Sequence, residues 1–221
     1  FTVPEGGTLG IIGATGSGKT TLLALLMRFY DVSDGSIRIG GRDIRSMEDG
    51  ELREKFGVAM QNDFIYEDTV AENIRIGRDI PMEELRRAAE YAQALDFIDA
   101  FEDGFDHMLT TKGTNVSGGQ RQRILIARAL AGHPEILLLD DSSSALDYKT
   151  DANLRRALRE HCNDTKATVL VAQRISAVMH CDHILVIDEG EIIGAGTHEE
   201  LLDTCDIYRE IADSQLGGAF E

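Results

Sequence analysis

Short apolar runs separated by amphipathic stretches organise most of the chain. Residues 136–139 are apolar without alternation and end at two aspartates, a pattern typical of a strand buried on both faces of a parallel sheet. Elsewhere apolar residues recur at helical spacing. The pattern predicts strands at 8–12, 57–60, 136–139 and 168–172, with helices between them at 21–29, 81–97, 121–130 and 148–161. Strands that alternate with helices predict an α/β fold with a mostly parallel sheet.

Three further segments complete this outline. Residues 36–39 alternate between apolar and polar and follow a turn, which predicts a short strand. The runs at 183–187 and 191–195 are spaced as the two strands of a hairpin. Two helical stretches at 197–215 close the chain, and the region around 81–97 reads as a helical insertion.

A glycine-rich stretch between the first strand and the first helix is the strongest chemical signal. Its glycines allow positive φ, so that successive N–H groups surround one anion, and the positive end of the next helix points there too. The Lys19 side chain can reach outer phosphates, and the Thr20 hydroxyl suits Mg²⁺. The alternative is a turn without a ligand, but every pattern position matches in the strand-loop-helix context that the motif requires. We therefore predict a triphosphate site at Gly13, Ala14, Thr15, Gly16, Ser17, Gly18, Lys19, Thr20 and Thr21.

Polar residues that end the other predicted strands fall at the same edge of the sheet. They are Gln61, Asp140, Asp141 and Gln173. Ligands of parallel α/β sheets bind at the carboxyl ends of the strands, so we expect these side chains to share one site with the glycine-rich loop.

The composition limits the class of partner. With 39 acidic and 22 basic residues among 221, the net charge of −17 argues against binding along a nucleic-acid backbone. Cys162, Cys181 and Cys205 are odd in number and widely spaced, so we expect three ordinary thiols in a reducing compartment. No apolar run approaches the ~20 residues that span a bilayer. A membrane role is therefore expected to depend on a partner or on a segment outside this sequence.

A second run with small residues precedes a predicted helix, the one at 121–130. It consists of Val116, Ser117, Gly118, Gly119 and Gln120. The other motifs of the chain are the glycine-rich loop, Gln61 in a Met-Gln-Asn context, residues 136–140, the run Ser144, Ala145, Leu146 and Asp147, and residues 196–202. Taken in their order along the chain, the motifs resemble the nucleotide-binding domain of ABC transporters, particularly of exporters. They correspond to the signature (with valine for the usual leucine), Walker A, Q loop, Walker B and D loop.

The resemblance implies a P-loop NTPase (RecA-like) core with a mostly parallel sheet, a small antiparallel β part and a helical subdomain. Residues 1–61 and 134–221 would form the core, and residues 62–133, which carry the signature, the helical subdomain. The family's N-terminal strand, its adenine-stacking aromatic residue and its membrane domain would lie upstream of Phe1, where the chain opens abruptly.

The family pairs two such domains head to tail, so that the ATP on one domain is covered by the signature of the other. The resemblance implies ATP and Mg²⁺ as cofactors, with Thr20 and Gln61 as direct metal ligands and Asp140 acting through water. The signature would act in trans, and Asp147 would lie at the dimer interface. The alternatives are a simply capped helix start for the signature and a plain helix N-cap for Asp147.

Two positions depart from the hydrolytically competent members of the family. Asp141 stands where those have a glutamate as general base, and Gln173 replaces the switch histidine that contacts the γ-phosphate. A general base must lie within ~2.6–3.2 Å of its proton, and a displacement of ~1 Å can cost on the order of 10²-fold in rate. Glutamine donates a hydrogen bond but carries no charge. We interpret both as catalytic positions in weakened form; the alternative is that both are tolerated.

Two lesser candidates have plainer alternatives. We interpret His198 as a structural residue at a helix start, because no second His or Cys lies at ligand spacing. Residues 64–66 (Phe-Ile-Tyr) resemble the family's contact with the membrane domain, although three apolar residues are also typical of a core.

The resulting hypothesis is the ATP-binding domain of an ABC exporter at the cytoplasmic face of the membrane. It would bind MgATP at a weakened site and lend its signature to a different partner chain, as the degenerate half of a heterodimeric exporter does. The alternatives are a homodimeric exporter ATPase in which Asp141 and Gln173 are functional, and a soluble ABC-type ATPase without a transport role. The substrate, selected by membrane helices elsewhere, is not encoded here.

Overall fold

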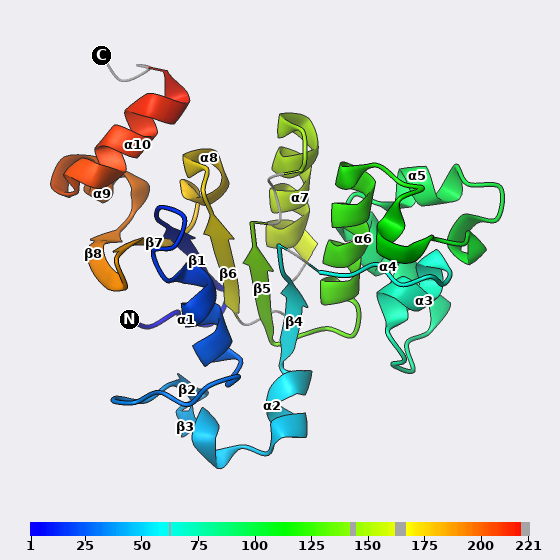
Figure 1. The fold of residues 1–221 in the computed structure, drawn as a ribbon, viewed down its shortest axis with the longest axis horizontal. Coiled ribbons are helices and arrows are strands. Elements are labelled where there is room, and N and C mark those ends of the chain that lie inside the picture. Colours follow the sequence, from blue (N-terminus) through cyan, green and yellow to red (C-terminus); the bar gives the residue numbers. More distant parts are fainter. Residues whose placement is uncertain (62, 142–144, 162–166, 218–221) are drawn as a thin grey trace.

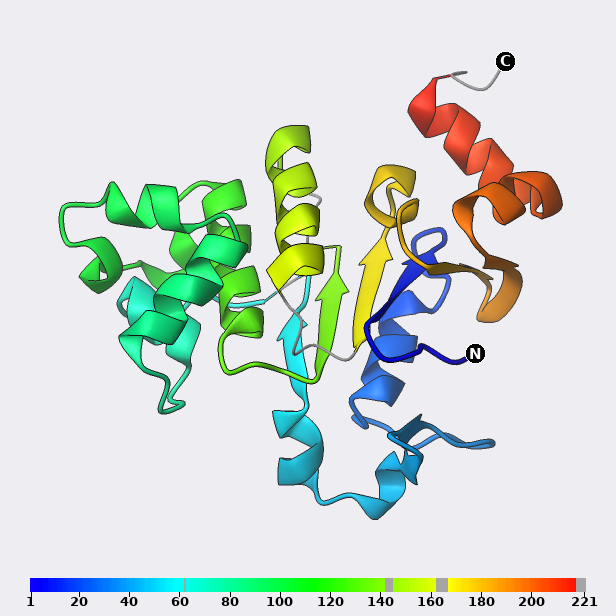
Figure 2. The same cartoon turned by 180° about the vertical axis from the view of Figure 1, so that it is seen from behind.

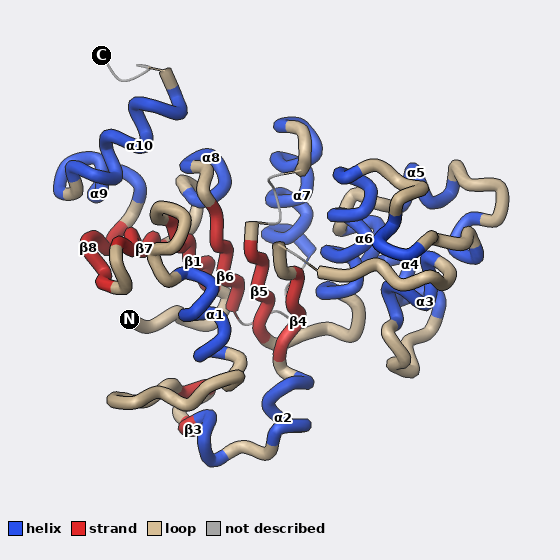
Figure 3. Tube along the Cα trace, viewed as in Figure 1, coloured by secondary structure: helices blue, strands red, loops and turns tan. Residues whose placement is uncertain are grey.

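A six-stranded mixed sheet forms the centre of the computed structural model, which describes residues 1–61, 63–141, 145–161 and 167–217. The strand order is β4-β5-β6-β1-β7-β8, and all neighbours are parallel except β7 and β8 (Figures 1 and 3). The strands are β1 (Gly7–Ile12), β4 (Phe56–Ala59), β5 (Ile136–Asp140), β6 (Ala167–Ala172), β7 (His183–Asp188) and β8 (Glu191–Gly196). A separate antiparallel pair consists of β2 (Arg38–Ile39) and β3 (Arg42–Asp43). The predicted α/β class, mostly parallel with a small antiparallel part, is confirmed.

The helices lie on both faces of the sheet and beyond one edge of it. They are α1 (Lys19–Leu26), α2 (Asp49–Glu54), α3 (Val70–Arg75), α4 (Met82–Tyr91), α5 (Leu95–Asp99), α6 (Gly118–Leu130), α7 (Tyr148–His161), α8 (Ile175–Val178), α9 (His198–Thr204) and α10 (Asp206–Leu216). Figure 1 shows α1 against one face, and Figure 2, seen from behind, shows α7 over the other. Helices α3 to α6 gather beyond β4, in the region predicted to be the helical subdomain.

The two faces of the sheet enter different apolar cores. On one face, Ile11 of β1 packs in a cluster with Leu23 of α1 and with Met27, which follows that helix. On the other, Ile12 packs in a cluster with Ile175 of α8 and with α10. Because neighbouring residues of the same strand are buried on opposite faces, the strands show no apolar/polar alternation in the sequence.

The prediction of one continuous helix at 81–97 is wrong. The structure ends α4 at Tyr91 and starts α5 at Leu95, with Gln93 between them at a φ of 58°. The turn is fixed by Arg123 of α6, whose Nη1 donates a hydrogen bond of 2.7 Å to the carbonyl oxygen of Gln93. A contact with a residue so distant in sequence cannot be read from helical periodicity.

Gly57 in β4 provides a test of the packing between the sheet and α6. A Cβ at this position would lie 2.0 Å from the carbonyl oxygen of Ala129. We expect Gly57→Ala to lower the free energy of unfolding by about 1–3 kcal/mol, because overpacking a tight contact forces the backbone to move. Urea unfolding measures the change. The control is Gly50→Ala in α2, where no atom lies within 4 Å; equal stability of the two variants would contradict this packing.

Candidate functional site

The ends of four strands bring the predicted site residues to one edge of the sheet. Ile12, the last residue of β1, lies beside Ala172 of β6, and Asp140 of β5 lies beside Val171. The glycine-rich loop thus leaves the sheet two strands away from Asp140. Gln61 follows β4, the neighbour of β5 on its other side.

The glycines of the loop occupy positions that a side chain would disturb. Gly16 and Gly18 have φ of 84° and 106°, in the left-handed region. A Cβ at Gly13 would lie 2.1 Å from the carbonyl oxygen of Ile187 in β7. A tight loop with left-handed glycines turns its N–H groups inward, which is the geometry of a phosphate cradle.

Lys19, the first residue of α1, is folded back into this loop. Its Nζ donates to the carbonyl oxygens of Gly13 at 2.8 Å and Ala14 at 2.7 Å, and only 8% of the residue is exposed. Burial lowers the pKa of Lys19, and the negative charges of Asp140 and Asp141 partly oppose that shift. The loop carbonyls and the two carboxylates therefore hold a positive charge beside the cradle.

Asp140 is a buried carboxylate at the end of β5, with 5% of the residue exposed. Burial raises its pKa and the neighbouring Asp141 raises it further, whereas the Thr20 hydroxyl, which donates to Oδ2 at 3.4 Å, and Lys19 act in the opposite direction. A buried carboxylate whose ionisation is unfavourable is a strong ligand for a cation. The structure thus brings together two of the predicted metal ligands, Thr20 and Asp140.

Asp141 has an unusual backbone conformation and a specific partner. Its φ of 48° lies in the left-handed region, which Asp tolerates better than most residues. Its N–H donates to the carbonyl oxygen of Val171 at 2.8 Å, and its Oδ2 accepts a hydrogen bond of 3.1 Å from Nε2 of Gln61. The structure therefore joins the predicted metal ligand Gln61 to a predicted catalytic position.

Gln173, the other predicted catalytic position, is exposed just after β6. Its carbonyl oxygen accepts a hydrogen bond of 2.8 Å from Nε2 of Gln215, which lies near the end of α10. Sequence analysis missed Gln215, because it belongs to no motif and lies 42 positions from Gln173.

The signature forms the start of α6 and is held as a capping box. The Ser117 hydroxyl accepts from the Gln120 N–H at 3.2 Å, and Oε1 of Gln120 accepts from the Ser117 N–H at 2.9 Å. Val116 is half-buried before it, and Ser117 and Gly118 are exposed. Figure 1 shows α6 beyond β4, far from the loop beside β1. The structure does not bring the signature to the cradle of its own chain.

The predicted D-loop residue Asp147 is the N-cap of α7. Its carboxylate accepts from the N–H of Thr150 at 3.0 Å and from the Thr150 hydroxyl at 2.7 Å, and these bonds lower the pKa of Asp147. The plain N-cap alternative is therefore present in the structure. A Cβ at Gly119 would lie 3.2 Å from the carbonyl oxygen of Ala145, so the signature adjoins the D loop. Ser144 lies outside the described residues.

The lesser candidates have clear surroundings. Nδ1 of His198 lies 2.8 Å from the hydroxyl of the fully buried Tyr208, which fits the predicted structural role. Phe64 and Tyr66 are 51% and 55% exposed, whereas Ile65 between them is buried.

Within residues 1–61, 63–141, 145–161 and 167–217, no group of three His, Cys, Asp or Glu side chains could hold a metal ion.

The two thiols in the described part of the chain fit the prediction of ordinary cysteines. Cys181 and Cys205 are buried free cysteines, and burial raises the pKa of Cys181 to about 12. A thiol with that pKa is almost entirely protonated at neutral pH. Cys162 lies outside the described residues.

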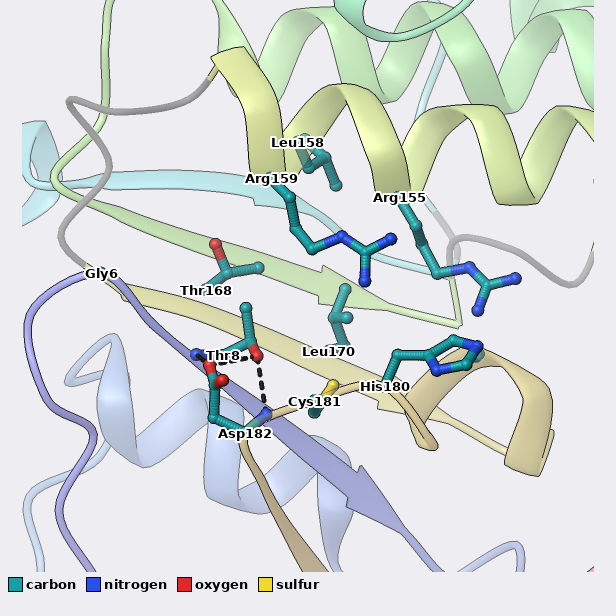
Figure 4. Close-up of a pocket in the computed structure, with 11 residues that line it drawn as sticks. Gly6, Thr8, Arg155, Leu158, Arg159, Thr168, Leu170, His180, Cys181 and Asp182 are labelled. Carbon is teal, nitrogen blue, oxygen red and sulfur yellow. Dashed lines mark hydrogen bonds between the residues drawn. The ribbon is translucent and has the colours of Figure 1, made fainter. Parts of the chain in front are cut away.

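A cavity of about 400 Å³ lies under α7 and beside α8, near the start of β1 (Figure 4). Its lining includes Arg155, Arg159 and His180 but none of the predicted site residues. Arg155 is already engaged, with Asp151 at 2.9 Å and with the carbonyl oxygen of Ser176 at 2.5 Å. The cavity is therefore separate from the nucleotide edge, although one residue of its wall supports the segment after Gln173.

The residues at the sheet edge fit a magnesium nucleotide. Helix α1 begins after Gly18 without a side-chain cap, so its first N–H groups are available to an anion. The hydroxyl of Thr20, the carboxylate of Asp140 and the amide oxygen of Gln61 are the oxygen ligands that Mg²⁺ prefers. Such an ion would offset the two buried negative charges beside one lysine.

Comparison with known proteins agrees with this geometry. The family model described as "ABC transporter" matches residues 1–144. The chain is 40% identical over 219 residues to an ATP-dependent lipid A-core flippase of Vibrio vulnificus, covering 98% of this chain and 37% of the relative. It is 43% identical over 217 residues to a β-(1→2)glucan export ATP-binding/permease protein of Rhodopseudomonas palustris, covering 98% and 36%.

A solved structure shows the same fold. The structure of a bacterial Atm1-family ABC exporter with ATP bound superposes with a TM-score of 0.90 at 36% identity, covering 96% of this chain and 37% of that one. The chain belongs to the ABC transporter family and is a nucleotide-binding domain of the exporter type. It spans little more than a third of the length of these relatives, and within its described part no helix is long and apolar enough to cross a membrane.

The buried charge of Asp140 gives a testable prediction. Because burial raises its pKa above the ordinary 3.8, ionised Asp140 costs stability at neutral pH, and the cost disappears as the pH falls through the raised pKa. We expect Asp140→Asn to raise the melting temperature of the nucleotide-free protein at pH 7 by roughly 2–4 °C, the shift produced by about 1 kcal/mol in a domain of this size. The advantage should vanish in acid, and Mg²⁺-dependent ATP affinity should be lost.

The control for this prediction is Asp182, a carboxylate with the opposite shift. Its Oδ2 accepts from the N–H and the hydroxyl of Thr8, both at 2.7 Å, and these bonds lower its pKa. It therefore contributes stability that is lost as the pH falls through the lowered pKa, and Asp182→Asn should melt lower at pH 7. Melting curves between pH 4 and 7 compare the two variants: the advantage of Asp140→Asn should shrink towards pH 4, whereas the deficit of Asp182→Asn should persist, because its lowered pKa lies below that range. A lower melting temperature for Asp140→Asn at pH 7 would contradict the prediction.

Proposed function

We propose that this domain binds MgATP at the sheet edge and uses ATP-driven pairing with a second nucleotide-binding domain to power export. The observation that carries the proposal is the cluster of the glycine loop, Lys19, Thr20 and Asp140, in which the buried Lys19 ammonium bonds to a loop carbonyl and the Thr20 hydroxyl to the buried Asp140 carboxylate. Export follows from the names of the relatives, which include a flippase and an export permease protein. The transmembrane domains of such a transporter would place this chain at the cytoplasmic face of the membrane.

The same reasoning gives the signature a role in trans. Ser117 and Gly118 are exposed at the start of α6, on the far side of the sheet from the cradle of the same chain. A helix start with exposed N–H groups attracts an anion, and the γ-phosphate on a partner's cradle is the anion that a head-to-tail pair would supply. Asp147 and the adjoining Ala145 would then lie at the interface of the pair.

We further propose that hydrolysis at this chain's own site is weak. Asp141 carries its carboxylate one methylene closer to the backbone than glutamate would, and its Oδ2 is engaged by Gln61 at 3.1 Å. Gln173 can donate a hydrogen bond to a phosphate but cannot carry the charge of a histidine. The partner is then a different chain whose own site hydrolyses ATP.

One observation favours a second candidate, a homodimeric exporter ATPase with a functional site. The φ of 48° at Asp141 lies where Asp is tolerated better than Glu. The aspartate can therefore reflect the backbone conformation rather than a loss of activity. The two candidates differ in the turnover of the unmodified site.

The contact with the membrane domain is proposed at Phe64 and Tyr66. Both rings are about half exposed, and cationic side chains lie near them: Nζ of Lys112 is 6.0 Å from the Phe64 centroid, and the Arg128 guanidinium is 5.7 Å from that of Tyr66. Aromatic residues and arginine are enriched in protein interfaces, which favours this surface as a contact.

The weakened site is tested by restoring the residues of competent family members. With the catalytic site of a different partner chain inactivated, we expect Asp141→Glu with Gln173→His to raise ATP hydrolysis by the complete exporter about 10- to 100-fold, since base placement and a transition-state donor each carry effects of that size. Phosphate release measures the change. Asp103→Glu, an exposed aspartate far from the edge, serves as the control. Brisk hydrolysis by the unmodified chain without a different partner would favour the homodimer.

The role of the signature in trans is tested with a matched pair of capping residues. Ser117 and Thr197 each cap a helix through a capping box, so replacement of either by alanine should cost about 1 kcal/mol of stability. Only Ser117→Ala should also slow hydrolysis by the exporter, about 10-fold or more, because it removes a hydrogen bond to a charged phosphate. Its MgATP affinity in an unpaired state should not change. Equal turnover of the two variants would refute the role in trans.

A further inference from the structure

The segment that carries Gln173 is held by two elements that are distant in sequence. Gln215 of α10 donates from Nε2 to the carbonyl oxygen of Gln173 and accepts at Oε1 from the N–H of Ile175, both at 2.8 Å. From the other side, Nη1 of Arg155 in α7 donates to the carbonyl oxygen of Ser176 at 2.5 Å. We call residues 173–176 the switch segment.

The Gln215 amide supplies bonds that the switch segment lacks locally. Strand β6 ends at Ala172, so the carbonyl of Gln173 lies beyond its sheet ladder. Helix α8 begins at Ile175, and its N-cap Arg174 makes no side-chain cap bond to the first N–H groups. One amide with a donor end and an acceptor end satisfies a group on each side of Arg174, which fixes both the position and the orientation of the backbone.

Helix α10 is a rigid support for this amide. Tyr208 and Ala212 of α10 are fully buried, and they belong to the same apolar cluster as Ile175 of the switch segment. The Tyr208 hydroxyl is also bonded to His198 of α9 at 2.8 Å. The end of α10 therefore cannot shift relative to the switch segment without opening this core.

We propose that Gln215 is a positioning residue that sets where the Gln173 side chain reaches at the nucleotide edge. The proposal rests on the proposed role of Gln173 as the γ-phosphate contact. A side chain can place its donor only as accurately as its backbone is held, and a displacement of ~1 Å at a reacting centre can cost on the order of 10²-fold in rate. Because Gln215 bonds to backbone atoms, it would position any residue at 173.

The decisive variant is Gln215→Met, which keeps the length and packing of the side chain and removes both hydrogen bonds. In the complete exporter at saturating MgATP, with the catalytic site of a different partner chain inactivated, we expect phosphate release to fall about 3- to 10-fold with unchanged MgATP affinity. The rate is measured with Asp141 unmodified and in the Asp141→Glu background, so that turnover at this site is followed at two levels. Ser214→Ala, the exposed neighbour on the same helix, should leave the rate unchanged.

A purely structural tether is separated from positioning by a double-mutant cycle. In a Gln173→Ala background, which has no side chain to position, Gln215→Met should change the rate less than 2-fold. An undiminished loss in that background, or no loss either with Asp141 unmodified or with Asp141→Glu, would overturn the proposal for Gln215. If Gln173→Ala itself leaves the rate unchanged, the proposed role of Gln173 fails and this proposal fails with it.

Discussion

One buried ammonium group, that of Lys19, is the charge on which the nucleotide edge depends. It is bonded to two carbonyl oxygens of its own loop, and the negative charges of two carboxylates at the end of β5 act on it. Three buried charges at one sheet edge are costly to hold without solvent, and burial shifts the pKa of both Lys19 and Asp140 towards the neutral form. The phosphates of a nucleotide offset the buried ammonium charge, and a divalent cation offsets the buried carboxylates, better than water in a narrow loop. The same edge therefore suits MgATP.

The surrounding fold follows from the need to fix these charges. Asp140 is the last residue of a strand with neighbours on both sides, and Lys19 begins a helix that packs against the sheet through Leu23. The elements that carry the signature, by contrast, gather beyond β4 and present Ser117 to solvent. A single chain thus keeps its phosphate cradle and its helix-start donors at separate places, as the proposed head-to-tail pair requires.

Sequence was sufficient where the structure depends on local chemistry. The helix at 148–161 and the fold class were predicted as found, because they follow from helical spacing, buried strands and their alternation. It failed where distant residues act on a backbone: Arg123 breaks the predicted helix at Gln93, and Gln215 holds the segment after β6. The left-handed conformation of Asp141 was also beyond prediction, since nothing in the residue type requires a φ of 48°.

The two positions that differ from competent family members are both held by backbone contacts that do not depend on their side chains: the Asp141 N–H bonds to Val171, and the Gln173 carbonyl bonds to Gln215. Backbone hydrogen bonds of this kind keep the main chain of the nucleotide edge in place when the side chain changes. Under the proposed function, affinity for ATP would depend on the loop and on Lys19, and the rate of hydrolysis would depend on Asp141 and Gln173. The two would therefore vary separately on the same scaffold, and a domain built in this way would keep binding ATP while a partner performs the chemistry.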